Sequence, residues 1–216
     1  MNREGTIVEL TGLAGSGKSY VKSMIETALR DAGLPCDTVR LTPKDLVTPA
    51  LPALVYRALK VVLLSRPKDL SRFLNSARHW FLVQLLYRKI RHRGSVAVVD
   101  EGVIHKVRAL RRNSSFAFMF ADIPLRWLDS IILPDVLVVV HCTAKDIVER
   151  RKQRDGIALN DMEVIVERSM NVTDQDARHL AGHAGTQVLR LDNSVGEGVD
   201  SQVKALVHVI AGLHVG

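Results

Sequence analysis

Residues 12–19 read Gly-Leu-Ala-Gly-Ser-Gly-Lys-Ser and satisfy the pattern GxxxxGK followed by Ser or Thr. Glycines let a chain fold closely around an anion, so that backbone N–H groups from about Gly15 to Ser19 point inward. A helix that begins there adds the positive end of its dipole. Lys18 would then bridge the β- and γ-phosphates of a nucleoside triphosphate, and the Ser19 hydroxyl would bind Mg²⁺. We therefore expect a nucleoside triphosphate and Mg²⁺ to bind at Gly12, Ala14, Gly15, Ser16, Gly17, Lys18 and Ser19.

Two carboxylates follow a second apolar run. Residues 96–99 are Val-Ala-Val-Val, and Asp100 and Glu101 come next. Ligands of open α/β sheets bind at the carboxyl ends of the strands, where this pair would lie. We expect Asp100 to organise Mg²⁺ together with Ser19, and Glu101 to accept a proton from the group that is phosphorylated. The pattern also allows the two roles to be exchanged.

A basic segment follows the apolar run at 135–142. Guanidinium groups stabilise the charge that spreads over a transferring phosphoryl group, so this segment is typical of a closing lid. Cations near the end of a helix also occur for purely local reasons, and a solvated helix face is the alternative. The candidate catalytic arginines of the segment are Arg150, Arg151 and Arg154.

The hydrophobic pattern must supply the elements that bring these residues together. Apolar, strand-like runs lie at 6–12, 36–41, 96–99, 135–142 and 187–191. Helical spacing follows at 17–33, at about 53–93, 144–154 and 161–180, and in a last helix with Val203, Leu206, Val207 and Ile210 on one side. Alternating apolar strands and helices predict an α/β fold with a parallel sheet covered on both faces.

Residues 46–94 are predicted to form a helical lobe inserted between the second and third strands of a single domain that spans 1–216. Between residues 46 and 99, ten Lys and Arg stand against one acid, Asp69. This gives the segment a charge of +9, so the rest of the chain is slightly acidic although the whole carries +7. Such a lobe would attract an anionic acceptor, or it would be a solubilising face.

In these motifs and in their order, the chain resembles the P-loop kinases of the thymidylate and nucleoside kinase group. The resemblance implies a P-loop NTPase three-layer fold with a five-stranded parallel sheet, ATP with Mg²⁺, and an arginine-bearing lid. It also implies a loop after the last strand that contacts the base. That loop would be residues 192–194, with Asn193 as a further nucleotide-binding residue.

One position departs from this resemblance. Thymidylate kinases place an arginine after the aspartate of the third strand, whereas this chain has Glu101. A second carboxylate would repel a phosphate acceptor and would suit the deprotonation of a hydroxyl. This position therefore favours a hydroxyl-bearing acceptor over a nucleoside monophosphate. Taken with the resemblance, we expect a kinase for a small anionic or hydroxyl-bearing acceptor, with a nucleoside-like or nucleotide-like compound favoured. Groups that would still hold a phosphate follow at Lys106, Arg108, Arg111 and Arg112.

Other functions and partners remain as alternatives or are disfavoured. A non-catalytic or regulatory ATP-binding module, and a kinase for a sugar or lipid-like acceptor at a membrane surface, are open alternatives, as is a homodimer. The chain lacks the DxxG and (N/T)KxD motifs of a GTPase, and its aromatic content of 5% disfavours nucleic acid. Two cysteines and no signal peptide predict a cytoplasmic protein.

Overall fold

Four parallel strands form the sheet of the computed structural model, which describes residues 4–42, 56, 70–106, 131–155, 162–194 and 198–215. The strands are β1 (Thr6–Thr11), β2 (Val96–Asp100), β3 (Val136–His141) and β4 (Gln187–Asp192). They lie in the order β2-β1-β3-β4, and each neighbouring pair is parallel. Four of the five predicted strands are thus confirmed to within two residues at each end.

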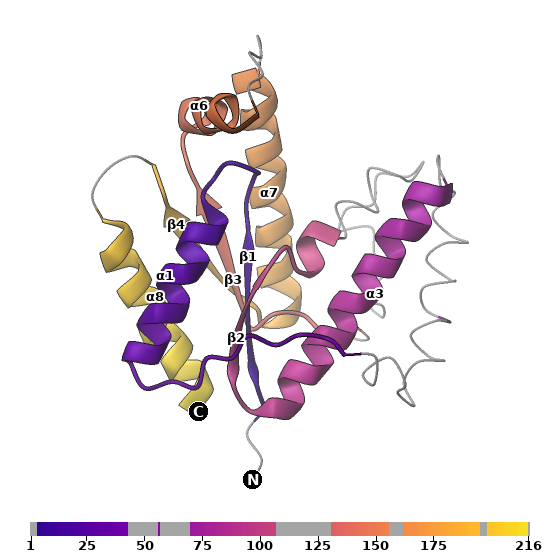
Figure 1. Ribbon diagram of the computed structural model, residues 1–216, viewed down its shortest axis with the longest axis vertical. Coiled ribbons are helices and arrows are strands. Elements are labelled where there is room, and N and C mark those ends of the chain that lie inside the picture. Colours follow the sequence, from indigo (N-terminus) through magenta and orange to yellow (C-terminus); the bar gives the residue numbers. More distant parts are fainter. Residues whose placement is uncertain are drawn as a thin grey trace.

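The prediction of a fifth strand at 36–41 is wrong for the described residues. Cys36 makes an isolated parallel bridge to Val96, on the outer side of β2. The chain then leaves the sheet: Val39 packs into the cluster that contains α3 (Leu70–Arg93), and the Arg40 carbonyl accepts a hydrogen bond from Lys89 Nζ at 2.9 Å. Packing against this helix therefore replaces pairing along β2 (Figure 1).

Helices cover both faces of the sheet, which makes a three-layer α/β fold (Figure 1). On one face, α1 (Lys18–Asp31) and α8 (Val199–Val215) pack on the side chains of Val8, Leu10, Val136, Val138 and Val140. On the other, α3 and α7 (Met162–Ala184) pack on Ile7, Leu137 and Val139. Successive residues of β1 and β3 thus alternate between two buried faces, as their continuous apolar runs predict.

The helix stripes predicted from spacing are largely confirmed. In α1, Val21, Ile25 and Leu29 are fully buried. In α8, Ile210 is fully buried, and the other three predicted residues, Val203, Leu206 and Val207, are at most 7% exposed. In the predicted lobe, α3 is a single helix of 24 residues, and the rest of the lobe lies outside the described residues apart from Tyr56. Leu74 of that helix is 46% exposed, so it does not share the buried side with Ala77.

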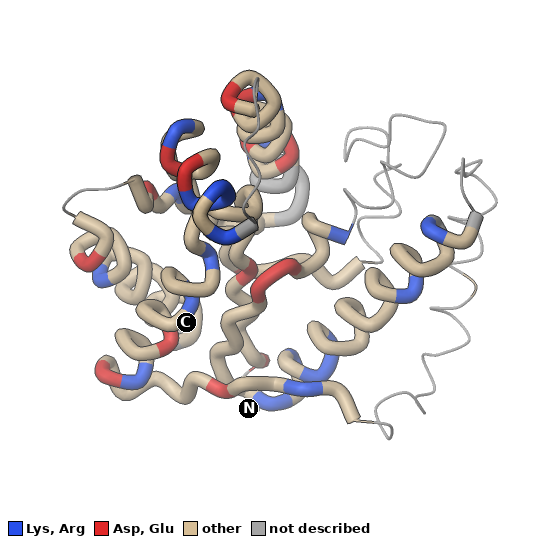
Figure 2. The backbone as a smooth tube through the Cα atoms, turned by 45° about the horizontal axis from the view of Figure 1, so that its top comes forward, with Lys and Arg blue, Asp and Glu red and all other residues tan. Residues whose placement is uncertain are grey.

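The charge of α3 is entirely basic, since the helix contains Lys and Arg and no acid (Figure 2). One of these cations is structural. The Arg91 guanidinium donates to both carboxylate oxygens of Asp135 at 2.8 Å and to the Gly5 carbonyl at 3.0 Å. Asp135 also accepts from the Ile7 N–H at 2.7 Å. Arg91 therefore ties α3 to the amino ends of β1 and β3 and is not available to a ligand.

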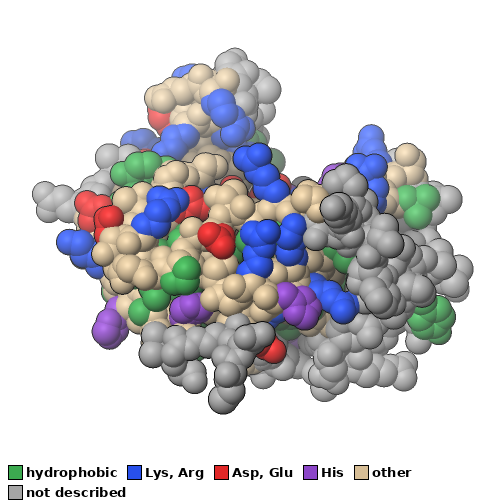
Figure 3. All heavy atoms as spheres, turned by 60° about the horizontal axis from the view of Figure 1, so that its bottom comes forward, with side chains coloured by type: hydrophobic (Ala, Val, Ile, Leu, Met, Phe, Trp, Pro, Cys, Tyr) green, Lys and Arg blue, Asp and Glu red, His purple; other side chains and the backbone are tan. Residues whose placement is uncertain are grey.

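Basic side chains are not confined to the edge that carries residues 12–19. Figure 3 shows the molecule from below the view of Figure 1, where Lys and Arg side chains again outnumber the acidic ones. Lys and Arg side chains are therefore also present on this face of the molecule. Among the described residues, no helix is both long and apolar enough to cross a membrane.

Candidate functional site

The glycine-rich loop of residues 12–19 connects β1 to α1 at the carboxyl edge of the sheet (Figure 1). Gly15 and Gly17 have φ angles of 94° and 84°, which favour glycine. Gly17 is the N-cap of α1, and no side chain of the described residues caps it. The first N–H groups of α1 are therefore available to an anion.

Lys18 folds back over this loop. Its Nζ donates to the Gly12 carbonyl at 3.2 Å and to the Leu13 carbonyl at 3.0 Å. The ammonium group thus lies beside the backbone that would surround a phosphate. A cation in this place adds to the positive end of α1 and favours a polyanionic ligand.

Ser19 and Asp100 come together at the same edge. Because Leu10 is paired with Asp100 in the β1–β2 register, β2 delivers its carboxylate next to the start of the loop. The Ser19 hydroxyl lies 3.5 Å from Asp100 Oδ2, a long contact for a hydrogen bond. Asp100 Oδ1 is buried and accepts no hydrogen bond from any residue that the structure describes. Buried carboxylate oxygens rarely lack a partner, so this atom points to a missing ligand.

The donor set at this point fits Mg²⁺. A hydroxyl and a carboxylate are hard oxygen ligands, and Mg²⁺ is usually held by one or two carboxylates with water and substrate phosphates completing its shell. In the described part of the chain, no group of three or more His, Cys, Asp and Glu side chains could form an all-protein metal site.

Glu101 lies next to Asp100 in a different environment. Its side chain is 49% exposed, and its Oε2 lies 3.5 Å from Lys106 Nζ and 3.6 Å from His105 Nε2. Lys106, a predicted phosphate contact, is thus the ion-pair partner of Glu101. The other predicted phosphate contacts, Arg108, Arg111 and Arg112, lie outside the described residues.

Two of the three predicted arginines contact the loop from α6 (Ala144–Asp155). Arg150 donates to the Gly15 carbonyl at 3.4 Å and to the Asn193 carbonyl at 3.0 Å, while Arg151 Nε donates to the Ala14 carbonyl at 2.8 Å. These two side chains are therefore not part of a merely solvated face. Arg154, nearer the end of α6, is exposed.

Asn193 supports the loop from the end of β4. It is 8% exposed, and its amide Nδ2 donates to the Ser16 carbonyl at 2.8 Å. A Cβ atom on Gly17 would collide with the same Nδ2. Next to it, two hydrogen bonds from Ser194 lower the pKa of Asp192. The described contacts of Asn193 thus hold the loop, a role that the sequence did not suggest.

Replacing Gly17 by alanine is expected to weaken ATP binding about tenfold, because the new Cβ would displace the Asn193 amide from Ser16. Its positive φ adds a cost of about 1 kcal/mol. Gly33 provides the matched control: its φ is 72°, and no described atom lies within 4 Å of an added Cβ. Equal loss of ATP affinity in Gly33→Ala and Gly17→Ala, measured by titration calorimetry, would contradict this account of the loop.

A buried carboxylate beneath the site was missed by the sequence analysis. Glu9 of β1 is 0% exposed and accepts a hydrogen bond from the Tyr87 hydroxyl at 2.7 Å. It also accepts from the backbone N–H groups of Val103 and Ile104, at 3.0 and 2.9 Å. Burial and the Glu9 charge raise the pKa of Tyr87, which keeps its hydroxyl a donor. The available signal was a single acid within an otherwise uncharged strand.

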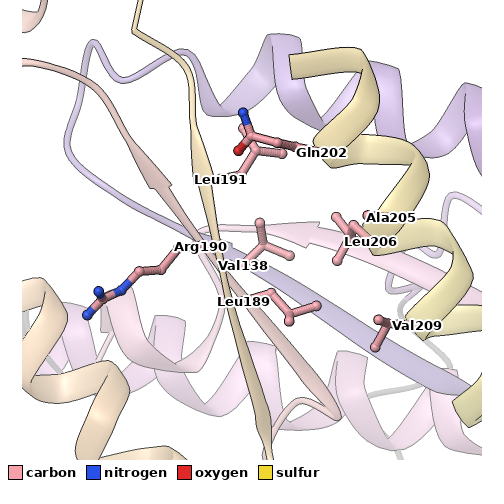
Figure 4. A pocket seen from close by; sticks show the side chains of 8 residues that line it. All are labelled: Val138, Leu189, Arg190, Leu191, Gln202, Ala205, Leu206 and Val209. Atoms are coloured by element: carbon pink, nitrogen blue, oxygen red, sulfur yellow. The ribbon is translucent and has the colours of Figure 1, made fainter. Parts of the chain in front are cut away.

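A cavity of about 190 Å³ lies away from these residues, between β4, β3 and α8 (Figure 4). Its walls are mainly apolar, and the Arg190 side chain points away from α8 toward its ion-pair partner Asp174. The Gln202 amide binds both backbone groups of Asp192. Because it lacks converging charged groups, we assign the functional site to the loop edge and not to this cavity.

Comparisons with known proteins identify no family for this chain. No protein-family model matches it, and no curated protein matches it either. Among solved structures, the chain is similar to the crystal structure of APE1195, with a TM-score of 0.45 and 14% identity over 98% of each chain.

Proposed function

We propose that this protein is a Mg²⁺-ATP-dependent kinase with a P-loop NTPase fold, which moves the γ-phosphate to a small acceptor. The observation that carries the proposal is the approach of Ser19 to Asp100 beside the Lys18 loop, with a buried oxygen of Asp100 that lacks a described partner. The place in the sheet supports it as well. The chain runs from β1 to β2 on one side of β1, and the next strand, β3, lies on the other side. Ligands of open α/β sheets bind where the strand order reverses in this way.

Each residue of the site has a role in this proposal. Bound Mg²⁺-ATP supplies the phosphoryl group and neutralises part of its charge. The N–H groups of Gly15, Gly17, Lys18 and Ser19 and the Lys18 ammonium would bind the phosphates, and Ser19 and Asp100 would hold the metal, whereas the Ser16 N–H donates to the Leu13 carbonyl at 3.1 Å. Arg150 and Arg151 keep α6 against the loop, so that a phosphate at the loop mouth lies beside two guanidinium groups.

The geometry supports different roles for the two carboxylates, with Asp100 as the metal ligand and Glu101 as the base. Asp100 approaches Ser19, whereas Glu101, which follows the end of β2, is half exposed and pairs with Lys106. An exposed carboxylate can reach the hydroxyl of an acceptor and accept its proton. The Lys106 ammonium at 3.5 Å offsets the charge of Glu101 and reduces its repulsion of an anionic acceptor. A hydroxyl-bearing acceptor that also carries a negative charge, such as a nucleoside phosphate, fits both observations.

A screen of acceptors tests this function. Formation of ADP from Mg²⁺-ATP is measured in the presence of nucleosides, nucleotides, sugars and lipid alcohols. We expect at least one small hydroxyl-bearing compound to raise the rate at least about tenfold over the background hydrolysis of ATP. If ATP binds and no compound raises the rate, the protein is an ATP-binding module and the kinase assignment is wrong.

A further inference from the structure

The turn that follows β2 is held from below by Glu9. The two oxygens of this buried carboxylate accept the N–H groups of Val103 and Ile104, where the chain becomes helical. Hydrogen bonds from N–H groups to a carboxylate are about twice as strong as neutral ones. Glu9 therefore fixes the backbone directly after the two acids of the site, at positions 100 and 101.

The backbone between these anchors has a conformation that needs such support. Glu101 has a φ of 57°, the one positive value for a non-glycine residue in the described part of the chain. Gly102 lies directly on the buried pair: an added Cβ would come within 2.6 Å of Glu9 Oε2 and would collide with the Tyr87 hydroxyl. A strained residue persists only where its surroundings hold it, and here Glu9 and Tyr87 do so.

Tyr87 connects this turn to the basic helix. It is 0% exposed on α3, and its hydroxyl donates to the same Glu9 oxygen that accepts the Val103 N–H. A shift of α3 would therefore move the Glu9 carboxylate, which fixes the backbone that follows residues 100–102. An apolar residue in place of Glu9 would leave the Tyr87 hydroxyl and the N–H groups of Val103 and Ile104 without this acceptor, so the carboxylate keeps the helix and the turn together.

We propose that Glu9 and Tyr87 are positioning residues, which hold Asp100 toward Ser19 and Glu101 toward the acceptor. Through Tyr87, this arrangement depends on how α3 packs against Glu9. The proposal rests on the kinase function proposed above. It adds that the positions of the metal ligand Asp100 and the base Glu101 depend on the basic helix α3. Neither residue touches a substrate, since both lie beneath the turn.

The test compares two variants of α3, one that removes a single buried hydrogen bond and one that removes two half-buried hydrogen bonds. Tyr87→Phe removes the bond to Glu9, and Gln84→Met removes the bonds of Gln84 to the backbone of Ile132, at 2.8 and 3.1 Å. We expect Tyr87→Phe to lower kcat about tenfold, through misplacement of the reacting groups, and to leave the KM for ATP within about twofold. Gln84→Met is expected to keep the kcat of the wild type.

A second measurement does not depend on activity. Amide hydrogen exchange at Val103 and Ile104 is expected to become about tenfold faster in Tyr87→Phe, because the carboxylate that accepts both N–H groups loses its own anchor. Exchange at these amides in Gln84→Met should remain that of the wild type. If the wild type shows no phosphoryl transfer, the kinase function fails, and the exchange rates alone decide whether Tyr87 anchors the turn.

Two outcomes would overturn the proposal. Unchanged exchange at Val103 and Ile104 in Tyr87→Phe would show that Tyr87 does not hold the turn. An equal loss of kcat in Gln84→Met would show that any weakening of α3 has the same effect. The isosteric Glu9→Gln variant adds a check. If Glu9 and Tyr87 act through one contact, the double variant should lose less kcat than the product of the two single losses.

Discussion

Replacing Lys18 by alanine is expected to lower the kcat for phosphoryl transfer by about 10²–10³-fold, because the variant loses the cation that would stabilise charge on the phosphates. The fold should remain intact. Lys18 Nζ donates to the carbonyls of Gly12 and Leu13, which belong to half-buried loop residues, and water can replace the ammonium group at these carbonyls. Single-turnover transfer of phosphate from ATP measures the effect.

Lys22 provides the matched control for this experiment. It lies one turn further along α1 and pairs with Glu26 at 3.7 Å on the helix surface, a contact worth a few tenths of a kcal/mol at most. Lys22→Ala should therefore have the transfer rate and the unfolding midpoint of the wild type. Unimpaired turnover in Lys18→Ala would refute the assignment of residues 12–19 as the phosphate-binding loop.

Replacing Asp100 by asparagine is expected to raise the half-saturating concentration of Mg²⁺ at least about tenfold and to lower kcat about 10²-fold. The substitution keeps the shape of the side chain but removes the charge that the metal needs. Titration of the transfer rate with Mg²⁺, at a saturating concentration of ATP, separates weaker metal binding from slower chemistry.

The neighbouring carboxylate provides the comparison for Asp100. Glu101→Gln should lower kcat, since the base is lost, but should leave the half-saturating concentration of Mg²⁺ near that of the wild type. If Glu101→Gln alone changed the Mg²⁺ dependence, the two acids would have to exchange their roles. If neither variant changed it, the metal site at Ser19 and Asp100 would be wrong.

The elements of this fold could be predicted where local pattern decides them. The apolar runs of β1 and β3 are buried on both faces, and α1 ends at Asp31, two residues before its predicted end. The strand predicted at 36–41 failed for a reason that no local pattern contains. Only Cys36 bridges to β2 within this run, whereas Val39 packs into the cluster that contains α3 and the Arg40 carbonyl accepts a hydrogen bond from Lys89.

The residues of the candidate site also differ in whether a local pattern reveals them. The 12–19 loop, Asp100 and Glu101 could be found from the sequence because short spacings and an adjoining strand define them. The contact between Glu9 and Tyr87 joins residues 78 positions apart, and the one between Asn193 and Ser16 joins residues 177 apart. Such pairs depend on how the sheet and helices come together, so spacing in a single sequence does not reveal them.

The pairing of Arg151 with the loop illustrates the difference for a charged group. The sequence left open whether the basic segment of α6 was a solvated face. The structure places Arg151 Nε 2.8 Å from the Ala14 carbonyl, because Ile147 of the same helix is buried with Cys142 beside the loop. The apolar cluster of Ile147, Cys142 and Val166, against which Leu13 of the loop packs, thus holds α6 beside the loop and brings Arg150 and Arg151 to the site.

Phosphorus NMR of the protein with Mg²⁺-ATP and the best acceptor from the screen tests the central claim most directly. The account predicts that ADP and a new phosphorylated acceptor appear in equal amounts, and that neither forms when Mg²⁺ is removed by a chelator. Equal amounts of ADP and inorganic phosphate with an unchanged acceptor, or ATP that remains intact while bound, would contradict it.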